Sequence, residues 1–406
     1  MSAVEAAPVP GPVTGRRVLF VDDEPHILAA LRRMLRSERE RWEMLFATSG
    51  VEALEVMDQE PVDAIVSDMR MPGMNGAELL AQVQRRTPAT ARIILSGQAD
   101  LESVLSVLRS AQQFLAKPCD VATLTGAVNQ ALRVQQMITD PTLRQIIGRV
   151  VSLPSLPTVY HDLVAAMDSP DVDLSALAQI LSSDVATSAE LLKLVNSAFF
   201  GLPRAIDSVN SAVSLLGLDT IQALVLTGSV FRGGKSPAQI ADVKRLQESA
   251  LRRAAIARVI SAREGWPTHE RNLAVLSCML RDVGGLVLAE DMPAAAARLS
   301  QQAAAGAGTG PADQAAREQE AYGCTVPQAS AYLLGLWGFA PAVVHTVAGQ
   351  PLVAPAPSTT HFEYALHFAD LRILDPLQHV VEEPNGYLTP VRMRDWNVAA
   401  DEVIAR

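Results

Sequence analysis

Three acidic residues and one lysine stand where they can do phosphoryl chemistry. Asp22 and Asp23 follow one short apolar run, Asp68 follows another, and Lys117 follows a third. A carboxylate can attack phosphorus to form an acyl phosphate, and a nearby ammonium offsets charge on the transferring oxygens. Three converging carboxylates repel one another unless a cation lies between them, and hard oxygen ligands favour a small divalent ion such as Mg²⁺. The residue types therefore indicate that Asp68 is a phosphoryl acceptor beside a magnesium site.

The elements that must position these side chains follow from the spacing of apolar residues. Five short runs predict strands: Val18–Val21, Met44–Ala47, Ala64–Val66, Ile93–Leu95 and Phe114–Ala116. Between them, stretches such as Ile27–Leu35 and Leu101–Leu108 have helical spacing. This alternation predicts a doubly wound, flavodoxin-like, five-stranded parallel sheet. Ligands bind at the carboxyl ends of such strands, where this chain has Asp22, Asp23, Asp68, Ser96 and Lys117.

Two further residues of this region are predicted to respond to a phosphoryl group on Asp68. Ser96 ends the fourth predicted strand and is placed to donate a hydroxyl hydrogen bond to the group, which would draw its loop inward. Phe114 lies three residues before Lys117 and can move into the space that this loop leaves. We therefore expect Ser96 and Phe114 to act as a switch.

Residues 16 to about 135 resemble the receiver domain of two-component response regulators. The resemblance rests on the string Asp68-Met-Arg-Met-Pro-Gly-Met-Asn-Gly76 together with the upstream Asp pair and Lys117. It implies that a sensor histidine kinase phosphorylates Asp68 and that Ser96, Phe114 and Lys117 form the switch. The implied ligands of Mg²⁺ are Asp22, Asp23, Asp68 and the backbone carbonyl of Arg70. Serine replaces the commoner threonine at position 96, which is a mild variation.

Past Asp120 the strand pattern ends and helical spacing takes over. A helical run continues to Asp140-Pro141, which we interpret as the last receiver helix extended into a linker. From Leu143 onward the chain should be almost wholly α-helical, with Asp184 and Asp219 as helix-capping candidates. Two stretches are predicted to be mobile loops or insertions, the Ala/Gly-rich Pro293–Asp313 and the Pro-rich Pro351–Thr360. The predicted domains are a flexible leader (1–15), a receiver domain (16–135), a helical linker (136–144) and an all-α domain (145–406).

The helical region resembles the HDOD domain, an output module related to HD and HD-GYP phosphohydrolases. The resemblance covers Leu143 to about Gln350 and rests on three strings: Leu153-Pro-Ser-Leu-Pro157, Leu177-Ala-Gln-Ile-Leu-Ser-Ser-Asp184 and Glu190-Leu-Leu-Lys-Leu-Val-Asn-Ser-Ala-Phe-Phe-Gly201. Asp184 should cap a helix whose Leu192, Val195 and Phe199 share a face, with Gly201 as its stop. A turn is expected at Leu215-Leu216-Gly217. The family usually has Pro after the capping Asp, and Val185 stands there instead.

An HD hydrolase activates water between metals held by histidines and an aspartate. Where such an enzyme would read Leu-His-Asp-Ile-Gly, this chain reads Leu280-Arg281-Asp282-Val283-Gly284, and arginine cannot bind metal. An ungapped alignment puts Glu248-Ser249 at the earlier His-Ser position, so Asp282 stands without its usual partners. His361, His367, Asp370 and His379 could form a replacement site, but we favour a capped or partly buried polar set. The predicted output is therefore binding of an unknown downstream protein.

Two other functions stay open. One is a degenerate HD-type metal-dependent phosphodiesterase that acts on a cyclic dinucleotide. The other is a nucleotide- or nucleic-acid-binding regulator, for which Arg252-Arg253 and Arg263 give slight support. The net charge of −10 argues against a broad phosphate-binding surface, so nucleic acid is not the expected partner. A homodimer is compatible with the sequence.

The composition of the chain bears on its number of domains and its location in the cell. The 406 residues, of which 49% are apolar and 19% charged, suffice for two domains with cores. No apolar run reaches the roughly 18 to 20 residues of a membrane span. The N-terminus lacks the features of a signal peptide, and Cys119, Cys278 and Cys324 form no Cys-x-x-Cys pair. These features predict a cytoplasmic protein without a membrane span.

Overall fold

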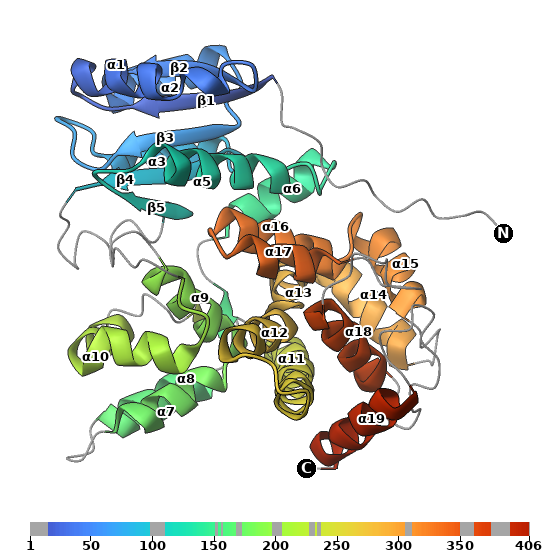
Figure 1. Ribbon diagram of the computed structural model, residues 1–406. Helices are drawn as coiled ribbons and strands as arrows, with labels where there is room; N and C mark the ends of the chain where they lie inside the picture. Colours follow the sequence, from blue (N-terminus) through green and yellow to red (C-terminus); the bar gives the residue numbers. More distant parts are fainter. Residues whose placement is uncertain are drawn as a thin grey trace. The chain divides into compact units, whose positions relative to one another are not determined.

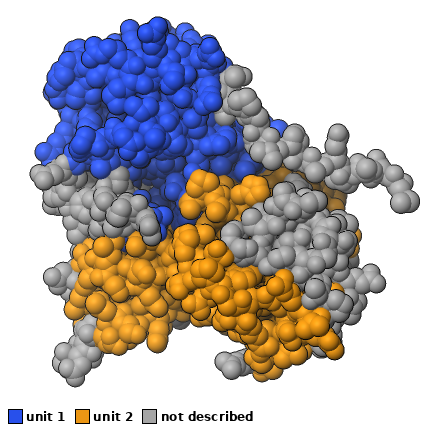
Figure 2. Space-filling view, in the orientation of Figure 1, with its two compact units in different colours: residues 1–151, 193–205, 332–339 blue, residues 152–192, 206–331, 340–406 orange. Residues whose placement is uncertain are grey.

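A computed structural model describes most of the chain (Figure 1). The described residues are 15–97, 110–150, 153–155, 157–167, 173–196, 205–226, 232–233, 237–304, 311–349, 361–374 and 390–405. Close contacts divide the chain into two compact units, drawn in different colours in Figure 2. Unit 1 comprises residues 1–151, 193–205 and 332–339, and unit 2 comprises residues 152–192, 206–331 and 340–406. The predicted leader, the predicted helix Leu101–Leu108 and the predicted loop Pro351–Thr360 lie outside the described residues.

A parallel sheet of five strands forms the centre of unit 1, as predicted. The strands are β1 (Arg16–Val21), β2 (Trp42–Ala47), β3 (Ala64–Asp68), β4 (Ala91–Ser96) and β5 (Gln113–Ala116). Their order is β2-β1-β3-β4-β5 and every neighbouring pair is parallel. This order is that of flavodoxin-like doubly wound folds, in which the ligand crevice lies at the carboxyl ends of β1 and β3.

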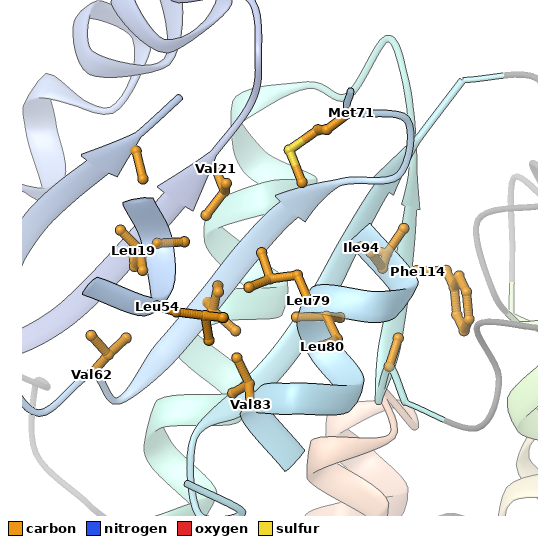
Figure 3. Close-up of a cluster of buried hydrophobic side chains, with 14 residues drawn as sticks. Leu19, Val21, Leu54, Val62, Met71, Leu79, Leu80, Val83, Ile94 and Phe114 are labelled. Atoms are coloured by element: carbon orange, nitrogen blue, oxygen red, sulfur yellow. The ribbon is translucent and has the colours of Figure 1, made fainter. Parts of the chain in front are cut away.

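Helices cover both faces of this sheet. They are α1 (Pro25–Met34), α2 (Gly50–Gln59), α3 (Gly76–Arg86) and α5 (Val121–Val134). On one face, α2 and α3 insert Leu54, Leu79 and Leu80 into a cluster of buried side chains (Figure 3). On the other face, Arg32 of α1 lies over the ring of Phe46, and Asn129 of α5 accepts a hydrogen bond from Trp42. Helices therefore pack against both faces of the sheet, as in other doubly wound folds, whose ligands bind at the strand ends.

The rest of the chain is mainly helical. The described helices are α6 (Pro141–Gly148), α7 (Pro157–Met167), α8 (Leu174–Ser182), α9 (Val185–Val195), α10 (Val209–Leu226), α11 (Pro237–Arg263), α12 (Thr268–Leu280), α13 (Val283–Asp291), α14 (Pro293–Ala304), α15 (Pro311–Tyr322), α16 (Val326–Leu336), α17 (Pro341–Ala348), α18 (His361–Leu374) and α19 (Pro390–Ile404). In unit 2, the long helix α11 packs against α12, α18 and α19. Trp396 and Phe368 make an edge-on contact in the core between these helices.

The helix cap and the turn that the sequence predicts in the helical region are confirmed among the described residues. Asp184 caps α9, because its Oδ1 accepts a hydrogen bond of 2.7 Å from the backbone N–H of Thr187. Leu192 and Val195 are buried on this helix. Gly217 interrupts α10 with a positive φ of 72°, at the expected turn. Phe199 and Gly201 lie outside the described residues.

Two expectations about this region were wrong. Most of Pro293–Asp313 is helical rather than loop, because alanine is the strongest helix former and a proline opens both α14 and α15. The last sheet-flanking helix does not extend to Asp140, since α5 ends at Val134 and α6 begins at Pro141. The region is mainly helical as predicted, apart from a short parallel strand pair, β6 (Pro154–Ser155) with β7 (Arg232–Gly233).

One segment of the described chain, Thr268–Asp291, is long and apolar enough to cross a membrane. It comprises α12 and α13, and 78% of its apolar window is buried inside the protein. A core helix of a soluble protein has the same length and composition, so this segment is weak evidence for a membrane span.

Candidate functional site

Three of the predicted site residues converge at the carboxyl edge of the sheet. Asp22 follows β1, Asp68 ends β3, and Lys117 follows β5. The Nζ atom of Lys117 donates to Oδ2 of Asp22 at 2.7 Å and to Oδ1 of Asp68. The side chains of Asp22 and Asp68 are only 3% and 11% exposed, against 25% for Lys117. An ammonium ion therefore bridges two nearly buried carboxylates that belong to separate strands.

The backbone fixes the second oxygen of each carboxylate. The N–H of Glu24 donates to Oδ1 of Asp22 at 3.0 Å, and the N–H of Arg70 donates to Oδ2 of Asp68 at 2.6 Å. Partial burial lowers the pKa of Lys117, but its hydrogen bonds to Asp22 and Asp68, together with the negative charge of these two carboxylates, raise that pKa above its usual value. Lys117 thus stays cationic at neutral pH.

The loop after Asp68 explains why the motif ends in Asn75-Gly76. Asn75 and Glu78 form a capping box that starts α3, with bonds of 2.9 and 3.1 Å between side chains and backbone N–H groups. A Cβ atom on Gly76 would lie 2.2 Å from the carbonyl oxygen of Asp68, so no side chain fits there. The glycine lets α3 begin directly against the end of β3, which holds the Asp68 backbone in place.

The other predicted residues lie nearby without joining this ion pair in the described contacts. Asp23 is half-buried beside Asp22, and the Ser96 hydroxyl, at the end of β4, donates to the carbonyl of Gly97 at 3.3 Å. Phe114 is 7% exposed and belongs, with Ile94, to the buried cluster of the sheet (Figure 3). In this conformation Phe114 is therefore packed inward.

The donor set at the strand ends suits a hard cation. Asp22 and Asp68 offer carboxylate oxygens, Asp23 is adjacent, and the Arg70 carbonyl follows Asp68 in the chain. Among the described residues no three His, Cys, Asp or Glu side chains form a ready-made metal cluster, and Lys117 holds Asp22 and Asp68. The chemistry of the donors fits Mg²⁺, whereas the ligand set itself stays a prediction.

A second polar cluster lies inside unit 2 and consists of two arginines and two aspartates. Arg281 lies 2.6 Å (Nε) from Oδ2 of Asp370 and 3.0 Å (Nη1) from Oδ1 of Asp282. Arg253, on α11, lies 2.9 Å (Nε) from Oδ1 of Asp370 and also pairs with Asp282. All four side chains are at most 12% exposed. Burial alone would raise the pKa of Asp282, but Arg253 and Arg281 together lower it.

The structure shows which side chains surround Asp282. It pairs with Arg281 and with Arg253, one of the arginines that gave slight support to nucleic-acid binding. Glu248, which the alignment puts at the His-Ser position of HD hydrolases, is exposed. Its Oε1 lies 3.9 Å from Nζ of Lys244.

The remaining proposed ligands and cations stand as follows. Asp370 belongs to the cluster, whereas the side chains of His361 and His367, and all of His379, lie outside what the structure describes. Arg263 is exposed and pairs with Glu402. Arg253 is buried, so it no longer supports a nucleic-acid interface.

Comparison with known proteins identifies both regions. Residues 18–129 match the family model of the response regulator receiver domain, and residues 153–351 match that of the HDOD domain. The transcriptional regulatory protein GlrR of Escherichia coli (strain K12) is 35% identical over 131 residues, which are 32% of this chain and 29% of that protein. The response regulator protein PilR of Pseudomonas aeruginosa is 33% identical over 121 residues, 30% of this chain and 27% of that protein. The chain thus spans less than a third of the length of either relative.

A solved structure, the MmoQ response regulator from Methylococcus capsulatus str. Bath, is 23% identical with a TM-score of 0.47 and covers 63% of this chain and 97% of its own. The receiver match contains Asp22, Asp68 and Lys117, and the HDOD match contains Arg253 and Arg281 but ends before Asp370. This chain therefore belongs to the two-component response regulators, with an N-terminal receiver domain and a C-terminal HDOD domain.

Proposed function

We propose that Asp68 accepts a phosphoryl group from a sensor histidine kinase and that the HDOD domain passes the signal to a downstream protein without catalysing a second reaction. The observation that carries the first part is the bridge from Lys117 to the carboxylates of Asp22 and Asp68. The bridge puts an ammonium group beside a strand-end carboxylate that is followed by a tight, glycine-dependent loop.

Each residue has a role in this proposal. Asp68 is the nucleophile, held by the N–H of Arg70, and Lys117 stabilises charge on the transferring oxygens. Asp22, Asp23, Asp68 and the Arg70 carbonyl would hold Mg²⁺, which when bound supplies further positive charge to the phosphoryl oxygens. Once Asp68 carries a phosphoryl group, the Ser96 hydroxyl breaks its hydrogen bond to the Gly97 carbonyl and donates to a phosphoryl oxygen instead. Phe114 then changes its packing.

The first part is tested by incubating the full chain with acetyl phosphate and Mg²⁺ and measuring the intact mass. We expect an increase of one phosphoryl group that is sensitive to hydroxylamine, as acyl phosphates are. Asp68→Asn should abolish it, whereas Asp58→Asn, which removes an exposed carboxylate of α2, should leave it unchanged. Phosphorylation of Asp68→Asn at the wild-type level would contradict the assignment.

The cluster in unit 2 supports a non-catalytic HDOD domain. In HD hydrolases the corresponding motif aspartate faces metal ions, whereas here Asp282 faces the guanidinium groups of Arg253 and Arg281. Two buried cations that already satisfy two carboxylates leave little reason for a divalent ion to bind there.

Two measurements bear on this second part. Metal analysis of the purified chain, together with hydrolysis of bis(p-nitrophenyl) phosphate, should show neither a metal that depends on Asp282 nor activity. A pull-down that compares wild type with Asp68→Asn under phosphorylating conditions should recover a protein partner in an Asp68-dependent manner. Metal-dependent hydrolysis that Asp282→Asn abolishes would instead support the phosphodiesterase alternative.

A further inference from the structure

Arg92 is a buried arginine whose hydrogen bonds in the described chain go to backbone carbonyls. It is the second residue of β4 and is 1% exposed. Its Nε donates to the carbonyl of Ser110 at 2.7 Å, its Nη1 to those of Pro88 and Thr90 at 3.0 and 3.2 Å, and its Nη2 to that of Gly148 at 2.8 Å. Burial lowers the pKa of Arg92 to about 10, so it stays charged at neutral pH.

These four carbonyls belong to three segments that are separate in the sequence. Pro88 and Thr90 form the turn that enters β4, and Ser110 lies just before β5. Gly148 is the last residue of α6, the helix between the receiver and HDOD matches. One guanidinium therefore joins the beginnings of two sheet strands to the end of the linker helix.

The contact with α6 is close and has further support. A Cβ atom on Gly148 would lie 2.1 Å from the carbonyl oxygen of Pro88, so the two backbones touch. The side-chain amide of Gln84 donates to the carbonyl of Arg149 at 3.0 Å. Upstream of α6, the buried amide of Gln135 donates to the carbonyls of Asp63 and Ala89 at 2.9 and 3.0 Å. The end of α6 is thus fastened to the turn that precedes β4.

The two strands that start at Arg92 end at the predicted switch. Strand β4 ends at Ser96, roughly 13 Å along the strand from Arg92. Strand β5 contains Phe114 and leads into Lys117, and its first residues are tied to Arg92 because Gln112 exchanges two hydrogen bonds with the Arg92 backbone, at 2.9 and 3.0 Å. Pairing of β4 with β5 therefore gives a shift at the Ser96 and Lys117 end a route to the Arg92 end.

We propose that Arg92 is a positioning residue that couples the phosphorylation state of Asp68 to the linker helix α6. The inference rests on the proposed function of Asp68 but names a separate element, the contact of Arg92 with Gly148. Arginine is required because its planar fork presents several N–H groups in fixed directions, whereas a lysine ammonium is a single point with three donors. Lysine at this position keeps the positive charge but cannot donate hydrogen bonds to all three segments at once.

Hydrogen exchange measured by mass spectrometry on the full chain tests this coupling. In wild type, acetyl phosphate with Mg²⁺ should change the exchange rates of amides in residues 141–149 by about five-fold or more, the lower end of ordinary coupling between sites. In Arg92→Lys these amides should exchange faster without any phosphodonor, and phosphorylation should no longer change them. Arg86→Lys, at an exposed arginine of α3 that faces Asp58, is the matched control and should behave as wild type.

A second variant approaches the contact from the helix. Gly148→Ala retains Arg92 but forces Gly148 away from Pro88, so it should reproduce the faster exchange of residues 141–149. The anchoring role is overturned if both variants exchange as wild type does. The coupling is overturned if Asp68 is phosphorylated, by intact mass, and residues 141–149 do not respond. If Asp68 takes up no phosphoryl group, both the proposed function and the coupling are overturned. The anchoring of α6 by Arg92 is then still tested by the exchange of residues 141–149 in the two variants without phosphodonor.

Discussion

The Nε atom of Arg281 lies 2.6 Å from Oδ2 of Asp370, which joins the α12–α13 turn to helix α18. Arg281 lies within the residues that match the HDOD family model, and Asp370 lies beyond them. The pair therefore ties the C-terminal helices to the centre of the helical domain. Arg281 and Asp370 are thus part of a buried ion network that also includes Arg253 and Asp282.

Loss of one cation from this network should strongly destabilise the helical domain. Arg281→Ala leaves Asp282 and Asp370 buried with less charge compensation, and breaking a buried pair typically costs about 3 to 5 kcal/mol. Urea unfolding of the full chain, followed by circular dichroism, should show this loss. Arg263→Ala removes an exposed pair with Glu402 and should cost less than about 1 kcal/mol. Equal midpoints for the two variants would contradict the structural role of the network.

The cap of α9 should matter more than an ordinary cap. Asp184 is fully buried, and besides capping Thr187 its Oδ2 accepts a bond of 2.6 Å from the amide of Gln247 on α11. Asp184→Ala removes the cap and leaves the Gln247 amide without this acceptor, so we expect a loss of about 2 to 3 kcal/mol in the free energy of unfolding. Asp173→Ala, at the exposed cap of α8, is the matched control with an expected loss of about 1 kcal/mol. A smaller loss for Asp184 than for Asp173 would refute the argument.

Glu318 on α15 should make stability depend on pH. Burial raises its pKa above the ordinary 4.5, while bonds to Val326 and Gln314 and the charge of Arg281 only partly oppose this effect. The folded chain then binds more protons than the unfolded chain between pH 4.5 and the raised pKa, so stability falls as the pH rises through this window. Glu318→Gln removes this titration. The difference in stability between the variant and wild type should therefore shift in favour of the variant when the pH is raised from 4 to 7. Unfolding midpoints at several pH values check the slope, with the exposed Glu320→Gln as control.

Local patterns were enough to predict that Asp22, Asp68 and Lys117 converge. Each of Asp22, Asp68 and Lys117 follows a short apolar run, and parallel topology alone brings the ends of such runs to one edge. The cap at Asp184 was likewise readable, because capping depends on residues three positions apart. These features needed no knowledge of how distant segments pack.

The buried networks could not be predicted in the same way. Arg253 and Asp370 meet because α11 packs against α18, and helical spacing does not reveal which helices are neighbours. The same limit hid Arg92, whose acceptors are carbonyls and leave no trace in side-chain types. Pro293–Asp313 was misread because its three glycines, at positions 306, 308 and 310, outweighed the alanine-rich flanks that form α14 and α15.

Magnesium should bind the receiver site in competition with Lys117. A ligand that binds only the folded state stabilises it by about 1.4 kcal/mol at ten times its dissociation constant, so Mg²⁺ should raise the Tm of the receiver transition. Asp22→Asn and Asp68→Asn each remove a carboxylate oxygen from the donor set and should abolish this rise, whereas Asp58→Asn should retain it. Lys117→Met removes the cation that now bridges Asp22 and Asp68, so Mg²⁺ should act at lower concentration than in wild type. Titration of Tm against Mg²⁺ distinguishes these variants. A rise that survives in both aspartate variants would place the bound ion elsewhere, and a loss in Lys117→Met would show that the ammonium supports the metal site rather than competes with it.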